Sequence, residues 1–395
     1  MELYEITGAG THNKGAFLML KTVIRRLSSG AAGDIRFGVD PYHAGDYYLR
    51  ALEGLYQLAP SWNGNSQFNQ RWKTFRSRLV YKLISKRYRD ALGLVHRDRC
   101  RGLIDISGLK YSDLFPLDSS TNAIGLIDAY YKKRGAPVVF LPQMVGPFSG
   151  QHSDAFRRLF ERADLFYVRD SVSLTHARAL VGNSDKLRQA PDITIFSDDA
   201  TDETPASARR RVCMIPNSKV IVKGAATADA YREQFARVAQ RVASSMFELS
   251  IVVHDASAAD NALVEDILQL PDIIAAKPAV IRSDDPVILK RYIAASRFIV
   301  SSRYHSIVAA LSCGVPAIAL GWAHKYETLL DEFGVKELNG SPSAPASALD
   351  ETLDALLDDA RLTALSDTIH NRKEAMAATS DAMWDAVRKT LNIVK

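Results

Sequence analysis

The sequence is poor in cysteine and has no long apolar run. Its 395 residues include three cysteines, Cys100, Cys213 and Cys313, which are far apart and odd in number. They therefore form neither a disulfide framework nor a metal-binding motif, and we predict no metal site and no cofactor. No apolar stretch approaches the roughly 20 residues that a membrane-spanning helix needs. Because the first residues form a predicted strand rather than a signal peptide, we expect a cytoplasmic protein.

Positive charge is concentrated in one segment. The net charge is +5, yet residues 71–101 hold eleven Lys and Arg against two Asp. Trp72, Phe75, Leu79 and Leu83 recur there at helical spacing. A basic amphipathic helix suits an anionic membrane surface, which would make the protein peripheral at the inner face of the membrane. The alternative is a helix packed on its own domain with a solvated charged face. Nucleic acid is not expected, because no recognition fold accompanies the charge.

Strands and helices alternate along most of the chain, which indicates an α/β fold with mostly parallel sheets. We predict an N-terminal Rossmann-like domain over residues 1–200, with a basic helical insert at about 65–101. A second Rossmann-like domain is predicted over residues 211–370 and a C-terminal helix over 371–395, with Trp384 and Val387 as core anchors. The polar stretch 197–211 lacks apolar periodicity and separates the domains.

A glycine-rich loop, Gly8–Gly15, follows the first strand and opens a helix. Its spacing differs from the G-x-G-x-x-G fingerprint, so we reject a nicotinamide or flavin site. Asn13 and Lys14 lie at the helix entry. Asn13 either caps the helix or contacts substrate, and the sequence favours neither.

The most informative stretch is Ile299–Tyr326. An apolar strand ends in Ser302-Arg303-Tyr304-His305, a helix of small residues follows, and a second strand leads to Trp322-Ala323-His324-Lys325. Strand, helix and strand form a βαβ unit, and ligands of open α/β sheets bind at the carboxyl ends of the strands. Arg303, His305 and Lys325 should therefore converge on one rim. Such a rim suits a phosphate or a carboxylate.

These residues resemble the polysaccharide pyruvyl transferase family, which has a Ser-Arg-x-His segment, then Ala-Leu-x-x-Gly-x-Pro and a Lys-containing loop. Further matching segments are Asn13–Gly15, Gln143–Phe148, Arg169–Ser173, Pro191-Asp192 and Pro216-Asn217. The resemblance implies two Rossmann-like domains facing a cleft, as in GT-B glycosyltransferases, with a C-terminal helix that could cross back to the first domain. It also implies transfer of pyruvate from phosphoenolpyruvate to two hydroxyls of a sugar, which gives a cyclic ketal and phosphate.

If the resemblance holds, the site for phosphoenolpyruvate, the donor, needs fixed cations and a general acid. Arg303 binds an anion bidentately, Lys325 adds a point charge, and His305 is the candidate general acid because it titrates near neutrality. Arg169, at a strand end where no structural partner is expected, is the second anion binder. The remaining donor-binding candidates are Ser302, Asn217 and His254. His254 has an alternative role as a hydrogen-bonded turn residue.

The acceptor is expected to be an exopolysaccharide, a capsule or cell-wall glycan, or a lipid-linked precursor of one. The candidate acceptor-binding residues are Asn13, Lys14, Asp105, Asp113 and Gln143. The turn after Asp105 departs from the family's glycine-rich turn, so the group that meets the acceptor stays open.

Two other functions compete with pyruvyl transfer. A GT-B glycosyltransferase that uses a nucleotide sugar fits the same fold, since fold does not fix chemistry. A non-catalytic glycan-binding component of a polysaccharide assembly complex is the second alternative. A general acid beside cations argues against it, because a binding module has no need of one.

Overall fold

A computed structural model describes residues 1–42, 44–59, 70–197, 204–255, 257–321 and 323–394 of the protein. Three features of the sequence prediction lie at least partly outside the described residues. They are Trp322, the first residues of the basic insert and residues 198–203 of the predicted boundary at 197–211.

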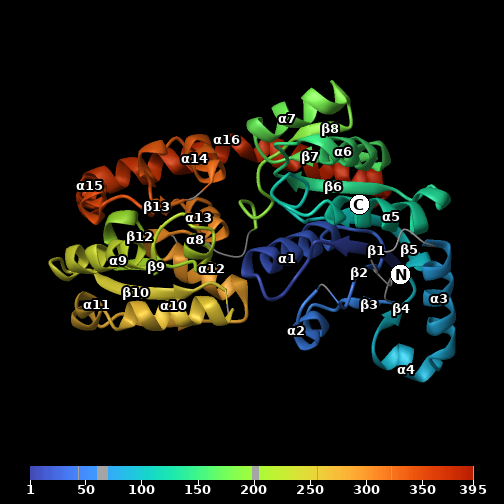
Figure 1. The fold of residues 1–395 in the computed structure, drawn as a ribbon, viewed down its shortest axis with the longest axis horizontal. Helices are drawn as coiled ribbons and strands as arrows, with labels where there is room; N and C mark the ends of the chain where they lie inside the picture. Colours follow the sequence, from blue (N-terminus) through green and yellow to red (C-terminus); the bar gives the residue numbers. More distant parts are fainter. Residues whose placement is uncertain (43, 60–69, 198–203, 256, 322, 395) are drawn as a thin grey trace. The chain divides into compact units, whose positions relative to one another are not determined.

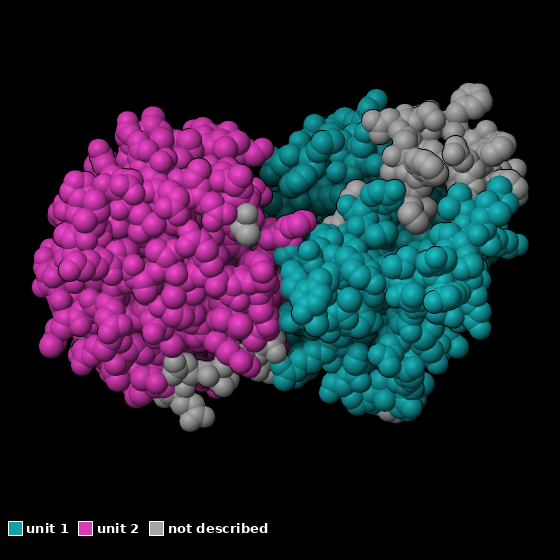
Figure 2. All heavy atoms as spheres, turned by 90° about the horizontal axis from the view of Figure 1, so that it is seen from below, with its two compact units in different colours: residues 1–11, 19–193, 378–395 teal, residues 12–18, 194–377 magenta. Residues whose placement is uncertain are grey.

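The chain divides into two compact units (Figure 2). Unit 1 comprises residues 1–11, 19–193 and 378–395, and unit 2 comprises residues 12–18 and 194–377. The division differs from the predicted ranges at two places. Residues 12–18 belong to unit 2 instead of the N-terminal domain, and the C-terminal helix α16 (Asp359–Leu391) begins earlier than residue 371. The last residues of α16 belong to unit 1, so the chain does return to its first domain.

Unit 1 contains a parallel sheet in which eight strands are described (Figure 1). The order is β4-β3-β2-β1-β5-β6-β7-β8. The strands are β1 (Glu2–Thr7), β2 (Ile35–Val39), β3 (Tyr56–Leu58), β4 (Leu94–Val95), β5 (Cys100–Asp105), β6 (Val138–Gln143), β7 (Leu165–Val168) and β8 (Leu187–Gln189). The helices are α1 (Lys14–Ser28, which starts in unit 2), α2 (Tyr47–Leu52), α3 (Gln70–Leu83), α4 (Lys86–Ala91), α5 (Asp118–Tyr130), α6 (Gly150–Arg162) and α7 (Ser171–Val181).

Apolar residues on both faces of this sheet are buried. Leu3 packs in a core cluster with Ile124 and Ile127 of α5, whereas the Tyr4 hydroxyl donates to the Leu391 carbonyl of α16 at 3.0 Å. Because successive strand residues point to opposite faces, α5 and the end of α16 cover opposite sides of β1. Burial on both faces explains the continuous apolar runs in β6 and β7.

Unit 2 contains a parallel sheet with the order β11-β10-β9-β12-β13-β14 among its described strands. The strands are β9 (Arg211–Ile215), β10 (Glu248–Val253), β11 (Ala279–Arg282), β12 (Ser296–Ser301), β13 (Ala317–Leu320) and β14 (Asn339–Gly340). The helices are α8 (Lys219–Val222), α9 (Ala228–Ala243), α10 (Ala258–Leu268), α11 (Pro271–Ala276), α12 (Pro286–Ala294), α13 (Tyr304–Leu311), α14 (His324–Glu332), α15 (Asp350–Leu357) and most of α16.

Each sheet reverses its strand order once. The reversal lies between β1 and β5 in unit 1 and between β9 and β12 in unit 2. In unit 2 the order is that of a Rossmann fold, and ligands of such sheets bind at the carboxyl ends of the strands that flank the reversal. The predicted α/β fold with two parallel sheets is confirmed. Among the described helices, none combines the length and the apolar character that crossing a bilayer requires.

Candidate functional site

The strand reversal of unit 2 brings two polar turns together. Asn217 follows β9 and Ser302 follows β12, and both are buried. The Asn217 Nδ2 donates to the Ser302 carbonyl at 2.9 Å, and the Tyr326 hydroxyl donates to the same carbonyl at 2.8 Å. The Tyr231 hydroxyl donates to the Ser302 Oγ at 2.7 Å. Ser302 and Asn217, predicted as donor-binding residues, therefore hold the two turns in place.

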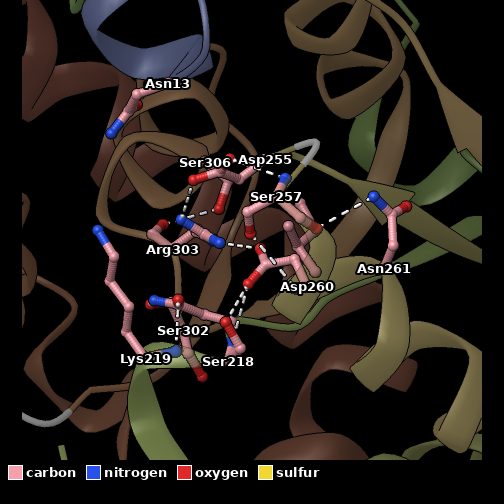
Figure 3. Close-up of polar contacts among 12 residues, drawn as sticks. Asn13, Ser218, Lys219, Asp255, Ser257, Asp260, Asn261, Ser302, Arg303 and Ser306 are labelled. Atoms are coloured by element: carbon pink, nitrogen blue, oxygen red, sulfur yellow. Dashed lines mark hydrogen bonds and ion pairs between the residues drawn. The ribbon is translucent and has the colours of Figure 1, made fainter. Parts of the chain in front are cut away.

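Arg303 lies between two carboxylates (Figure 3). Its Nη1 donates to the Asp255 Oδ2 at 3.0 Å, and it forms an ion pair with Asp260. Asp260 is buried and also accepts the backbone N–H of Ser218 at 3.0 Å. Burial lowers the pKa of the Arg303 guanidinium, and the charge of Asp255 opposes that shift. Two carboxylates thus flank the guanidinium, which the motif alone does not predict.

His305 lies in the first turn of α13, directly against the backbone of Gly15 at the start of α1. A Cβ atom added to Gly15 would lie 2.2 Å from the His305 Nδ1 and 2.7 Å from its Cβ. No side chain fits at that separation, so the approach of the imidazole requires glycine at position 15.

Asn13 and Lys14, predicted for the acceptor side of the first domain, lie instead in unit 2 beside this cluster. The Asn13 Oδ1 accepts the backbone N–H of Gly15 at 2.9 Å, so Asn13 caps α1, and its backbone pairs with Asp255. The Lys14 Nζ is buried and lies 3.2 Å from the Asp284 carbonyl oxygen and carboxylate.

His254 follows β10 and is buried at the same end of the sheet. Burial lowers its pKa to about 3, and the nearby positive charges of Arg303, His305 and Lys14 add to the shift. His254 is therefore neutral at neutral pH.

Lys325 lies in the first turn of α14, after β13. Its Nζ is 5.3 Å from the centroids of both the Tyr304 and the Tyr326 rings, and Tyr304 adjoins Arg303 and His305 in sequence. Arg303 and His305 thus follow β12, and Lys325 follows the neighbouring parallel strand β13, at the same edge of the sheet.

Four residues at this site were not predicted from the sequence, namely Lys219, Tyr231, Asp255 and Asp260. Lys219 is exposed, and its side chain extends away from the two carboxylates (Figure 3). Its position after the Pro216-Asn217 turn, which matches the family, is a signal that could have identified it.

Ser257-x-x-Asp260 is a capping-box pattern, and the Ser257 Oγ does accept the Asp260 N–H at 3.3 Å. That pattern predicts the start of α10 but not the ion pair with Arg303.

In unit 1, Asp105 at the end of β5 is the centre of a hydrogen-bond network. Its carboxylate accepts from the Thr7 hydroxyl at 3.0 Å, the Tyr111 hydroxyl at 2.8 Å, the Ser107 N–H at 2.9 Å and the Gln143 Nε2 at 3.2 Å. Asp105 and Gln143 are both buried. These two predicted acceptor residues therefore join the ends of β1, β5 and β6.

A cavity of about 690 Å³ lies beside this network. Its lining residues include Thr7, Gly8, Asp105, Ser107, Lys110, Phe115, Asp118, Ser119 and Asn122. Glu5 and Arg97 also line it, and the Arg97 Nε donates to the two Glu5 carboxylate oxygens at 3.0 and 3.1 Å. Burial raises the pKa of Glu5, and the charge of Arg97 opposes that shift. The cavity is thus lined by the buried Glu5–Arg97 pair and by hydroxyl, amide and aromatic side chains, a set of groups that suits a sugar.

Asp113 and Arg169 have local partners in unit 1. Asp113 is exposed, accepts the Ser149 N–H at 3.0 Å and is not among the described residues that line the cavity. The expectation that Arg169 lacks a structural partner is wrong. Its Nη1 donates to Asp192 at 3.3 Å, and both side chains are buried.

Comparison with solved structures identifies the class of fold. S. aureus MnaA in complex with UDP has a TM-score of 0.61 at 11% identity, with 100% of this chain and 98% of that chain covered. UDP-GlcNAc 2-epimerase from Neisseria meningitidis gives 0.58 at 10% identity, with 96% and 99% covered. MurG from Acinetobacter baumannii gives 0.51 at 13% identity, with 98% and 100% covered. The protein thus has the GT-B-like fold.

Sequence comparison identifies the family, which is a narrower class than the fold. A comparison with curated protein sequences finds no match. The sequence model of the polysaccharide pyruvyl transferase family matches residues 13–324, from the cap of α1 to the start of α14. The chain belongs to the polysaccharide pyruvyl transferase family.

Proposed function

We propose that this protein transfers the pyruvyl group of phosphoenolpyruvate to two hydroxyls of one sugar, forming a cyclic ketal and releasing phosphate. The observation that carries the proposal is that Arg303 and His305 follow β12 and Lys325 follows the neighbouring strand β13 of unit 2. A histidine among cations supplies what an anionic enol donor needs, namely charge to bind it and an acid to protonate it.

The donor phosphate and carboxylate bind to the cations of unit 2 in this proposal. Asp260 has a side chain 2% exposed, whereas that of Asp255 is 16% exposed. An incoming anion therefore replaces Asp255 at the Arg303 Nη1, while Asp260 continues to orient the guanidinium. Lys325 and Lys219, on flexible stems, add point charges. The N-terminus of α13 adds a favourable dipole for the anion.

His305 is the proposed general acid. It gives its proton to the methylene carbon of phosphoenolpyruvate, and positive charge develops at the carbon that bears the phosphate. One sugar hydroxyl bonds to this carbon, the C–O bond to phosphate breaks, and the second hydroxyl closes the ketal. The two hydroxyls release two protons, of which one replaces the proton given by His305 and the other leaves with phosphate. Such an acid contributes about 10²–10⁴-fold to the rate.

The cavity of unit 1 is the proposed sugar site. Asp118, Ser119 and Asn122 line it with groups that can hydrogen-bond to hydroxyls, and Phe115 adds an apolar face. Asp105, with four donors on its carboxylate, positions the turn instead of accepting a proton. The acceptor belongs to an exopolysaccharide, a capsule or cell-wall glycan, or a lipid-linked precursor.

Ligand-induced stabilisation and phosphate release test the proposal together. We expect phosphoenolpyruvate to raise the melting temperature and phosphate to be released when a suitable glycoside is added. His305→Ala should lose nearly all turnover and keep donor binding, whereas His370→Ala, at an exposed position of α16, should behave like the wild type.

Nucleotide sugars are the decisive comparison, because MnaA and HepE from Anabaena (TM-score 0.52, 14% identity, 99% of each chain covered) are structures with bound UDP. Stabilisation by UDP-glucose or UDP-GlcNAc without any response to phosphoenolpyruvate would refute pyruvyl transfer and support a glycosyltransferase.

A further inference from the structure

The end of α3 and the adjoining α4 expose apolar side chains to solvent. Each of the five is at least 44% exposed: Leu79, Val80, Leu83, Tyr88 and Leu92. They occur within fourteen residues of each other in the sequence, so they form a local group. Scattered exposed leucines are normal on a protein surface, but a group of this size calls for a partner.

The orientation of α3 explains the exposure. Ser77 is buried and Tyr81 and Ile84 are half-buried, at helical spacing, so this stripe faces the rest of unit 1. Leu79 and Leu83, one turn apart, lie on the other side of the helix. Both helices lie at the side of unit 1 where β4 begins the sheet (Figure 1).

Three cations accompany the apolar group. Lys82, Lys86 and Arg87 are exposed, and the described part of the chain gives none of them an ion-pair partner. Two neighbouring arginines differ, since the Arg78 Nε pairs with Asp98 at 2.8 Å and the Arg89 guanidinium lies 4.5 Å from the centroid of the Tyr81 ring. Lys82, Lys86 and Arg87 thus lie between exposed apolar side chains in the sequence.

We propose that this basic–apolar surface docks the protein on a membrane that contains anionic lipids. The surface consists of Leu79, Val80, Lys82, Leu83, Lys86, Arg87, Tyr88 and Leu92. Cations attract the lipid headgroups, while leucine and tyrosine side chains enter the boundary between headgroups and acyl chains. A nucleic acid would use the cations but leave the leucines in water. The inference stands without the proposed chemistry, although docking through unit 1 would suit a lipid-linked sugar.

Vesicle co-sedimentation of the full chain tests the proposal. The wild type should bind phosphatidylcholine vesicles that contain phosphatidylglycerol, bind pure phosphatidylcholine much more weakly, and be released by salt. The triple variant K82E/K86E/R87E should bind about a hundredfold more weakly. The matched control K133E/R158E/R178E changes the net charge equally at exposed positions of unit 1 outside this surface and should bind like the wild type.

A second variant tests the apolar half of the surface. L79S/L83S/Y88S keeps all charges and should also lose vesicle binding while circular dichroism stays unchanged. Failure of the wild type to bind anionic vesicles at low salt would overturn the proposal. So would an equal loss in the charge control, or wild-type binding by the apolar variant, which would indicate a site for polyanions in general. Phosphate release with a soluble acceptor should be unchanged in all three variants, which separates this test from that of the proposed chemistry.

Discussion

At the scale of single residues, the contact between Gly15 and His305 links the first loop of the chain to its most informative motif. The loop reads from sequence as a helix-entry turn, and Asn13 does cap α1. The turn does not explain why residue 15 is glycine. Glycine is needed there because the His305 imidazole occupies the space that a side chain would fill. Two motifs almost 300 residues apart therefore describe one site.

Replacing Gly15 by alanine should displace His305. The added methyl would lie 2.2 Å from the His305 Nδ1, so the ring must move from its position in the site. We expect phosphate release to fall by about 10²-fold or more, the scale of a lost general acid. Overpacking should cost about 1–3 kcal/mol of stability. Gly33→Ala is the matched control, since nothing lies within 4 Å of its added Cβ. Equal activity of the two variants would show that His305 need not stay where it is.

His254 should make the protein sensitive to acid. Its folded-state pKa is about 3, against an ordinary value of 6.5. Between these values the unfolded chain binds a proton that the folded chain does not, so the free energy of unfolding falls as the pH drops from 6.5 towards 3. At pH 5 the loss from this residue is about 2 kcal/mol relative to pH 7.5. Denaturant unfolding at both pH values should show a smaller loss in His254→Gln than in the wild type, and the exposed His370→Gln should match the wild type.

At the scale of elements, Asp260 joins three segments at the strand reversal of unit 2. It lies in the first turn of α10, accepts from Ser218 after β9, and pairs with Arg303 after β12. The ends of two strands are thereby fixed relative to one helix.

Removing the buried carboxylate should be costly. Asp260→Ala leaves the Arg303 guanidinium buried without its inner partner, which typically destabilises by about 3–5 kcal/mol. Asp255 is more exposed, so Asp255→Ala should cost about 1 kcal/mol. Chemical denaturation of both variants measures the difference. A larger loss in Asp255→Ala would mean that the outer carboxylate, not Asp260, holds the arginine in place.

The elements around this site could be predicted from sequence, but their long-range partners could not. Two apolar runs separated by a helix of small residues predict the βαβ unit, and the structure contains it as β12, α13 and β13. The ion pair of Arg303 with Asp260 joins residues whose pairing depends on how β10 and β12 flank β9, which no local pattern encodes. The same limit applies to Arg169 and Asp192, and to the placement of Asn13 and Lys14 in unit 2.

At the scale of the whole molecule, α16 is shared by both units. Leu362 and Ile369 are buried in the core of unit 2, whereas Trp384 is buried in the part of the helix that belongs to unit 1. The sequence predicts Trp384 as a core anchor because an aromatic residue recurs with apolar ones at helical spacing. The predicted division at residue 371 falls inside α16, which begins at Asp359.

Substitutions at the two ends of α16 should therefore act on different units. Trp384→Ala and Leu362→Ala each remove a fully buried side chain and should cost about 3–5 and 2–5 kcal/mol respectively. Hydrogen exchange followed by mass spectrometry can locate the effect, because local opening raises exchange only where protection is lost. Trp384→Ala should raise exchange in β1 and β5, and Leu362→Ala in β12 and β13. If both variants raise exchange equally in all four strands, the units unfold as one body and the helix does not serve two separate cores. The expected result, with each variant raising exchange in one unit alone, would show that the helix stabilises the two cores independently. Loss of its last residues would then weaken unit 1, which holds the proposed sugar cavity, and leave the cation cluster of unit 2 folded.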